Sequence, residues 1–395
     1  MTHRSAVSRW MFEEYRMDER SLAIGRIIFA LALLALWFDP NNPRYLWIAK
    51  FPESFYAPPP GLGFFLHRPP PALVMWLLMA GVFTFTIGLL VGWKTRVMGL
   101  ALAATMLVGN SFEYSFGKIN HDSLTIVVAL TMSFSGWERA YSADTRRGPF
   151  RDEPPAWPLA LLALLIGLAM FSAGWPKLLS GWLDPSTQSA KGHVIANLYA
   201  TERPTAGASL ALTYGPAWLW ELLDWGTVGI ELAFLPAAFS KRALRIVCAL
   251  AACFHAGIHF TMDIFFYPNL VAYGMFVDWE RGLEVGGLRR AMEWWGRTAG
   301  RVRGWMLPVA GGLVAGVYSI SGNPVVTVLD AGGDGRWVRD SVLAMTAAAA
   351  GVVFLVWSVG SRLRPAFTAA AGRLFRMQGG IAGGRPGHLG HHPDV

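Results

Sequence analysis

Residues 157–184 read WPLALLALLIGLAMFSAGWPKLLSGWLD, and this stretch indicates the kind of protein that the chain forms. Its first half contains no charge, and the stretch as a whole is long enough to cross a bilayer as a helix. Its second half supplies small residues, two tryptophans, a proline and one lysine, Lys177. Small residues let a neighbouring helix or a flat ligand come close, and tryptophan favours the membrane–water boundary. The stretch therefore predicts a membrane helix that ends at a polar site.

Two interpretations of Lys177 are open from this stretch. Pro176 removes a helical hydrogen-bond donor and bends the chain, so the Lys177 amine need not point outward. An amine held at an apolar boundary loses solvation, which favours its neutral, basic form. The alternative is an ordinary interfacial lysine that extends to the lipid headgroups.

The composition is that of an integral membrane protein. Of the 395 residues, 53% are hydrophobic and only 15% are charged, too few to cover a soluble surface. The net charge of +8 comes from basic residues in the loops between apolar runs, which is a topology signal and does not indicate nucleic-acid binding. Cys248 and Cys253 lie in one apolar segment and do not imply a disulfide framework. The N-terminus carries charges of both signs and is expected to be retained.

The apolar runs predict an all-α, polytopic membrane bundle of about ten transmembrane helices. These are expected at 21–38, 71–93, 96–116, 122–137, 157–175, 224–239, 242–262, 264–279, 304–320 and 342–361. Short interfacial helices are expected at 192–200 and 217–223. The predicted organisation is a cytoplasmic segment at 1–20, a catalytic or binding membrane domain at 21–285, additional membrane helices at 286–363 and a disordered basic tail at 364–395.

The basic residues predict the orientation of the bundle. If the helices alternate in direction, the lysines and arginines of 94–96, 139–151, 241–245, 281–303 and 362–376 fall on one side. The positive-inside rule places this side in the cytoplasm, with both termini. The Ala-, Gly- and Arg-rich composition suggests a multi-pass protein of a bacterial inner membrane.

Several polar side chains are predicted to lie in the outer leaflet with Lys177. Asn120 and His121 begin the fourth predicted helix, His255 and His259 share a face of the seventh, and Glu231 lies about two turns inside the sixth. Ionisable groups at membrane depth are costly and by default mark a functional site. The candidate binding residues, including the tryptophans beside Lys177, are Asn120, Trp175, Trp182, Glu231, His255 and His259.

Each of these residues also has a structural interpretation. Asn120 and His121 can cap a helix, and Glu231 can be a neutral, hydrogen-bonded carboxylic acid. His255 and His259 have the spacing of a metal-binding pair, with Asp263 four residues further on, but no convincing ligand set completes it. No metal site is therefore expected.

Three segments carry a resemblance to a known family. AGWPKLLSGW at 173–182, NHDSL at 120–124 and FHAGIHFTMDIFFYPNLVAYGMFVDW at 254–279 resemble the horizontally transferred transmembrane (HTTM) family, which includes the membrane domain of the vitamin K-dependent gamma-glutamyl carboxylase. The resemblance covers residues 20–285. It implies that Lys177 deprotonates a reduced quinone and that His121 supports it.

The resemblance also implies a cofactor and partners. The expected cofactor is a reduced vitamin K or menaquinone-type quinone, whose epoxidation would be coupled to carboxylation or to a related proton abstraction. Expected partners are membrane lipid, the quinone and a peptide or protein on the extracytoplasmic side, but no nucleic acid. The carboxylase has a large soluble domain after its helices that holds protein substrates, and nothing in this sequence obviously replaces it, which weakens the case for a protein substrate. This chain also has Pro176 where the carboxylase has a second lysine.

Two other functions remain open. One is a non-catalytic quinone- or lipid-binding protein, or an accessory factor in peptide export or maturation. The other is a transporter, although no inverted repeat is visible. An enzyme predicts that the Lys177 amine and a His121 ring nitrogen lie within hydrogen-bond reach of one another, directly or through one water, at the wall of a cavity.

Overall fold

The computed structural model describes residues 5–37, 45–58, 62–116, 121–148, 150, 152–202, 205–283, 288–321, 340–356 and 358. These ranges contain helices, turns and loops but no β-strand. The long helices are α2 (Glu19–Trp37), α3 (Ala72–Val91), α4 (Thr95–Tyr114), α6 (Trp157–Leu179), α9 (Ala217–Ala237) and α10 (Lys241–Met262). The shorter ones are α1 (Ala6–Arg9), α5 (Ser123–Met132), α7 (Ser189–Thr201), α8 (Ala206–Tyr214), α11 (Tyr267–Gly274), α12 (Trp279–Leu283), α13 (Leu288–Ala299), α14 (Met306–Ser321) and an unlabelled helix, Asp340–Val356.

Four helices of the described chain are long and apolar enough to cross a membrane, namely α2, α3, α6 and α10. The prediction of an all-helical membrane bundle is confirmed, whereas that of ten spanning helices is not. Helices form in all ten predicted regions, but α5 and α11 are short because turns follow Met132 and non-helical chain precedes Tyr267. The tail at 364–395 lies outside the described residues.

Helices α9 and α6 extend beyond their predicted boundaries. The predicted interfacial helix at 217–223 forms the first turns of the continuous helix α9, whereas the one at 192–200 corresponds to α7. Helix α6 continues past Pro176 to Leu179, four residues beyond its predicted end. A proline so near the end of a helix removes one backbone hydrogen bond and leaves the last turn closed, since the Ser180 amide donates to the Pro176 carbonyl at 2.9 Å.

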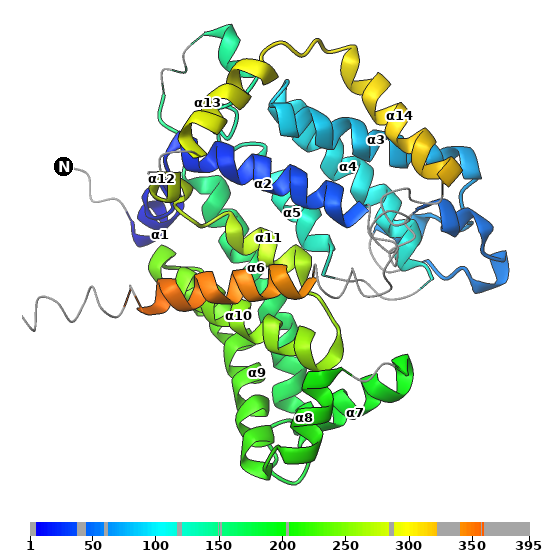
Figure 1. The fold of residues 1–395 in the computed structure, drawn as a ribbon, viewed down its shortest axis with the longest axis vertical. Coiled ribbons are helices and arrows are strands. Elements are labelled where there is room, and N and C mark those ends of the chain that lie inside the picture. Colours follow the sequence, from blue (N-terminus) through cyan, green and yellow to red (C-terminus); the bar gives the residue numbers. More distant parts are fainter. Residues whose placement is uncertain are drawn as a thin grey trace, which may run out of the picture.

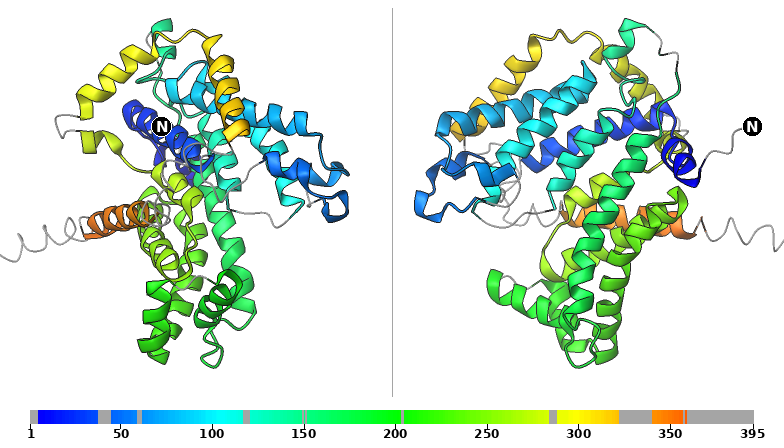
Figure 2. Two further views of the ribbon diagram at one scale, coloured as in Figure 1. Left: turned by 45° about the vertical axis from the view of Figure 1, so that its right-hand side comes forward. Right: turned by 180° about the vertical axis from the view of Figure 1, so that it is seen from behind.

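Helices α6, α9 and α10 form a column, and α7 and α8 lie at its far end (Figure 1). Figure 2 shows this column from two further sides. Two glycines of α6 set its distance from α9. A Cβ on Gly167 would lie 3.2 Å from the Phe234 carbonyl oxygen, and one on Gly174 would lie 2.9 Å from the Glu231 Cβ. Of the small residues predicted to allow close approach, Gly174 therefore faces α9, whereas Ser172 and Ala173 are exposed.

The other end of the bundle gathers the basic loops. The Trp10 indole and the Tyr15 hydroxyl donate to the Ala238 carbonyl at 2.9 and 2.8 Å, which ties the N-terminal segment to the α9–α10 turn. Arg20 pairs with Glu280 at 2.6 Å. Segments far apart in sequence thus meet at one end. We call this the basic end, and the end with α7 and α8 the α7–α8 end.

Candidate functional site

Lys177 and Glu231 form an ion pair between α6 and α9. The Lys177 amine donates a hydrogen bond to Glu231 Oε1, and the two side chains are 26% and 8% exposed. Lys177 belongs to the last turn of α6, about one turn after Gly174, which packs against Glu231. The amine also lies 5.2 Å from the centre of the Trp182 ring, within cation–π range. The structure therefore brings together Lys177, Glu231 and Trp182 from the predicted set.

The second carboxylate oxygen of Glu231 is open to a further donor. Oε2 is buried and has no hydrogen-bond partner among the described residues. Buried polar atoms in proteins nearly always have a partner, so an unpaired one at a candidate site indicates where a ligand donor fits. The pair thus offers a cation, a carboxylate and one unused acceptor at the same place.

The rings of His121, Phe266 and His255 form a group that we call the ring column. Phe266 lies 4.6 Å from His121 and 4.5 Å from His255, measured between ring centres. His255 is 3% exposed, and its Nε2 lies 3.2 Å from the Tyr273 hydroxyl. Its Nδ1 has no hydrogen-bond partner in the described part of the chain. Tyr273 in turn stacks on Phe234 with ring centres 5.4 Å apart, and Phe234 lies three residues after Glu231 in α9, so the ring column reaches the helix that carries the ion pair.

His121 and Lys177, the predicted catalytic residues, make direct contacts with different side chains. The amine of Lys177 is held by Glu231, whereas the His121 ring packs on Phe266. The hydrogen bond of the amine thus goes to a carboxylate. Glu231, which the sequence assigned only to binding, therefore lies next to the proposed base.

His259 does not join His255 in a shared site. Its Nε2 lies 3.2 Å from the Ser341 hydroxyl, and its Nδ1 lies 3.9 Å from Asp263 Oδ1. The two histidines share a face of α10 but contact different helices. Among the residues that the structure describes, no group of three His, Cys, Asp or Glu side chains is placed to hold a metal ion.

Of the remaining predicted residues, Trp175 lies apart and Asn120 is outside the described residues. Trp175 is 47% exposed and stacks on Phe171, with ring centres 5.6 Å apart. It therefore faces the surroundings of α6, which suits a tryptophan at a membrane boundary.

Phe266, Asn269 and Tyr273 did not stand out from the sequence as candidate site residues. The Asn269 amide lies 3.4 Å from the Tyr273 hydroxyl, and its Oδ1 has no hydrogen-bond partner among the described residues. All three belong to the quoted segment 254–279, whose density of aromatic side chains and single amide, Asn269, are the signals that could have identified them.

The comparisons with known proteins identify the family. The family model of the HTTM domain matches residues 15–280, about two thirds of the chain, including the ion pair and the ring column. Comparisons with curated proteins and with solved structures give no match. The HTTM domain is a transmembrane domain, in agreement with the four long apolar helices. This chain belongs to the HTTM domain family, the family of the vitamin K-dependent carboxylase membrane domain.

Proposed function

We propose that this protein is a membrane-embedded enzyme that uses Lys177 as a base on a reduced quinone, in a reaction related to quinone epoxidation coupled to carboxylation. The observation that carries the proposal is the Lys177–Glu231 pair, a lysine amine held by a mostly buried carboxylate between two membrane-domain helices. Burying two opposite charges is costly, so such a pair is more often retained for a function than for stability.

Glu231 supplies a route for the proton of Lys177. A lysine amine acts as a base only when it is neutral, and an ammonium group must first lose a proton. Glu231 Oε1 accepts the hydrogen bond from that amine and can take its proton. Lys177 then carries a lone pair beside the unpaired Oε2 of Glu231.

The residues around the pair fit a flat aromatic ligand with hydroxyl groups. The ring column and Trp182 offer aromatic faces, and Glu231 Oε2 and His255 Nδ1 offer unused polar atoms. A bound reduced quinone supplies a hydroxyl group for deprotonation and, with oxygen, the oxidative chemistry. Lys177 would take the hydroxyl proton, and the aromatic side chains would orient the ring and exclude water.

The proposed orientation places the basic end in the cytoplasm and the α7–α8 end in the outer leaflet of a bacterial inner membrane. Support comes from the basic loops meeting at one end and from Lys177 lying at the other end of α6. A peptide or protein substrate would then approach from outside the cell.

The proposal is tested by incubating purified protein with a reduced menaquinone analogue and oxygen and measuring the epoxide by mass spectrometry. We expect wild type to form the epoxide and Lys177→Ala to lose at least about 100-fold in rate. Lys191→Ala, which removes an amine from α7 at the same end, is the matched control and should leave the rate unchanged. A folded wild-type protein that binds the analogue without converting it would instead support the accessory or binding function.

A further inference from the structure

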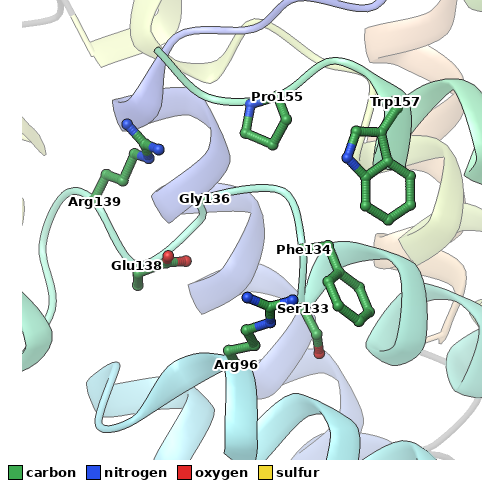
Figure 3. Close-up of a pocket in the computed structure, with 8 residues that line it drawn as sticks. All are labelled: Arg96, Ser133, Phe134, Gly136, Glu138, Arg139, Pro155 and Trp157. Carbon is green, nitrogen blue, oxygen red and sulfur yellow. The ribbon is translucent and has the colours of Figure 1, made fainter. Parts of the chain in front are cut away.

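A separate pocket lies at the basic end of the bundle (Figure 3). It has a volume of about 300 Å³ and is lined by Arg96, Ser133, Phe134, Gly136, Glu138, Arg139, Pro155 and Trp157. Trp157 is the first residue of α6, and Lys177 lies twenty residues later, about 30 Å away at 1.5 Å per residue. The pocket is therefore distinct from the candidate site of the proposed enzyme.

Two arginines give the pocket a positive charge and N–H groups that can bind an anion. Arg96 lies over the Phe134 ring at 4.5 Å, and Arg139 lies over the Phe150 ring at 5.2 Å. A guanidinium that stacks by its face keeps its N–H edge available for an anion. In the described part of the chain neither arginine forms an ion pair, and Arg139 Nε is enclosed without a hydrogen-bond partner.

Glu138 is the one acidic residue that lines the pocket, against two arginines, so the lining keeps a net positive charge. Burial raises the pKa of Glu138 above its ordinary range, and Glu138 Oε2 has no hydrogen-bond partner among the described residues. Gly136 has a φ of +80°, and a Cβ there would lie 2.7 Å from Arg139 Nε, so this glycine gives the guanidinium its room.

We infer that this pocket binds a phosphate group between Arg96 and Arg139, carried by an acidic phospholipid headgroup or by a free phosphate. Arginine binds phosphate oxygens through paired N–H groups, which a point charge cannot match. Trp157, Phe134 and Pro155 form an apolar wall beside the arginines, as an interfacial lipid requires (Figure 3). Basic pockets at the cytoplasmic side of membrane proteins suit anionic headgroups.

The test measures ligand affinity of the full chain purified in detergent. Phosphatidylglycerol is titrated in mixed micelles, with phosphatidylcholine as the reference lipid, and inorganic phosphate is titrated separately. We expect Arg96→Gln and Arg139→Gln each to weaken binding at least tenfold. Arg96→Lys, which keeps the charge but not the paired donors, should lose less than the glutamine variants do.

Arg242→Gln is the matched control, because Arg242 is the second residue of α10 as Arg96 is of α4, at the same end. Its affinity should equal that of wild type. Arginine-dependent binding of phosphatidylglycerol alone assigns the site to a lipid headgroup, and arginine-dependent binding of inorganic phosphate assigns it to a free phosphate. Either result supports the inference. Binding of neither probe, unchanged affinity in folded pocket variants, or an equal loss in Arg242→Gln overturns it.

Discussion

Two enclosed cations lie toward opposite ends of the bundle, and they are held in different ways. Arg26 of α2 is 0% exposed and donates to the carbonyls of Trp137 and Tyr141 at 3.0 and 2.7 Å. Lys177 is partly exposed and donates to the carboxylate of Glu231. A peptide carbonyl accepts a hydrogen bond but does not take up a proton, whereas a carboxylate does both. Arg26, bound to carbonyls, therefore fixes a loop, whereas Lys177, bound to a carboxylate, can exchange a proton.

The largest expected effect is on the structural cation. Arg26→Leu removes both hydrogen bonds and leaves two carbonyls in an interior setting, which should lower the free energy of unfolding by about 3 kcal/mol. Lys177→Ala should cost much less, because the remaining partner, Glu231, can be protonated. Thermal unfolding of both variants in detergent measures the difference. If the two substitutions destabilised the protein equally, the contrast between Arg26 as a structural cation and Lys177 as a proton-exchanging one would be contradicted.

The second-largest expected effect tests the close packing of α6 against α9 at Gly174. Gly174→Ala puts a Cβ 2.9 Å from the Glu231 Cβ, and such overpacking should destabilise the protein by about 1–3 kcal/mol. Gly226→Ala is the control, because a Cβ at this position of α9 meets nothing within 4 Å. It should be neutral or stabilise by about 0.5–1 kcal/mol, since alanine favours the helix. An equal loss of stability in the two variants would show that the close approach of α6 and α9 at Gly174 does not contribute to stability.

The smallest effect concerns an acid-sensitive contact at the basic end. Arg245 binds Asp278 through two hydrogen bonds, of 2.9 and 2.6 Å. Burial acts to raise the pKa of Asp278, but Arg245 outweighs it, so the pKa lies below its usual range. The pair therefore contributes stability above the unfolded-state pKa of about 3.9, and this is lost as the pH falls through the lower folded-state pKa.

Asp278→Asn tests whether the Arg245–Asp278 pair loses its stabilising effect as the pH falls. At pH 7 the variant should be less stable than wild type by about 1 kcal/mol, the upper range for a partly exposed pair. The difference should shrink as the pH falls below about 4, because the Asp278 carboxyl then binds a proton first in the unfolded state and, at lower pH, in the folded state. A difference that stays constant from pH 7 to pH 3 would contradict the assignment.

The helices were predictable from the sequence because hydropathy and length act locally. The apolar run of 157–175 identifies α6, and the small residues near Lys177 predict its close contact with another helix. The number of spanning helices was less predictable. Whether an apolar run such as 264–279 forms one helix depends on the tertiary packing of its aromatic and proline residues. Here helix α11 covers Tyr267–Gly274, and the next helix, α12, begins only at Trp279.

The members of the candidate site were predictable, but their pairing was not. Lys177 and Glu231 both stand out as ionisable residues in apolar sequence. Their contact depends on the register of α6 against α9, which Gly167 and Gly174 set across more than fifty residues of chain. Likewise, Phe266 contacts His121 and His255 only because the chain after α10 returns to the start of α5. Sequence spacing carries no information on either contact.

The central claim is that Lys177 and Glu231 act as one proton-exchanging unit. The most direct measurement is the rate of epoxide formation from a reduced menaquinone analogue by wild type, Lys177→Ala, Glu231→Gln and the double variant, each verified as folded. We predict that Glu231→Gln loses at least about 100-fold and that the double variant is no slower than Lys177→Ala, because the two residues perform one step. No turnover by wild type, or losses that multiply in the double variant, would contradict the account.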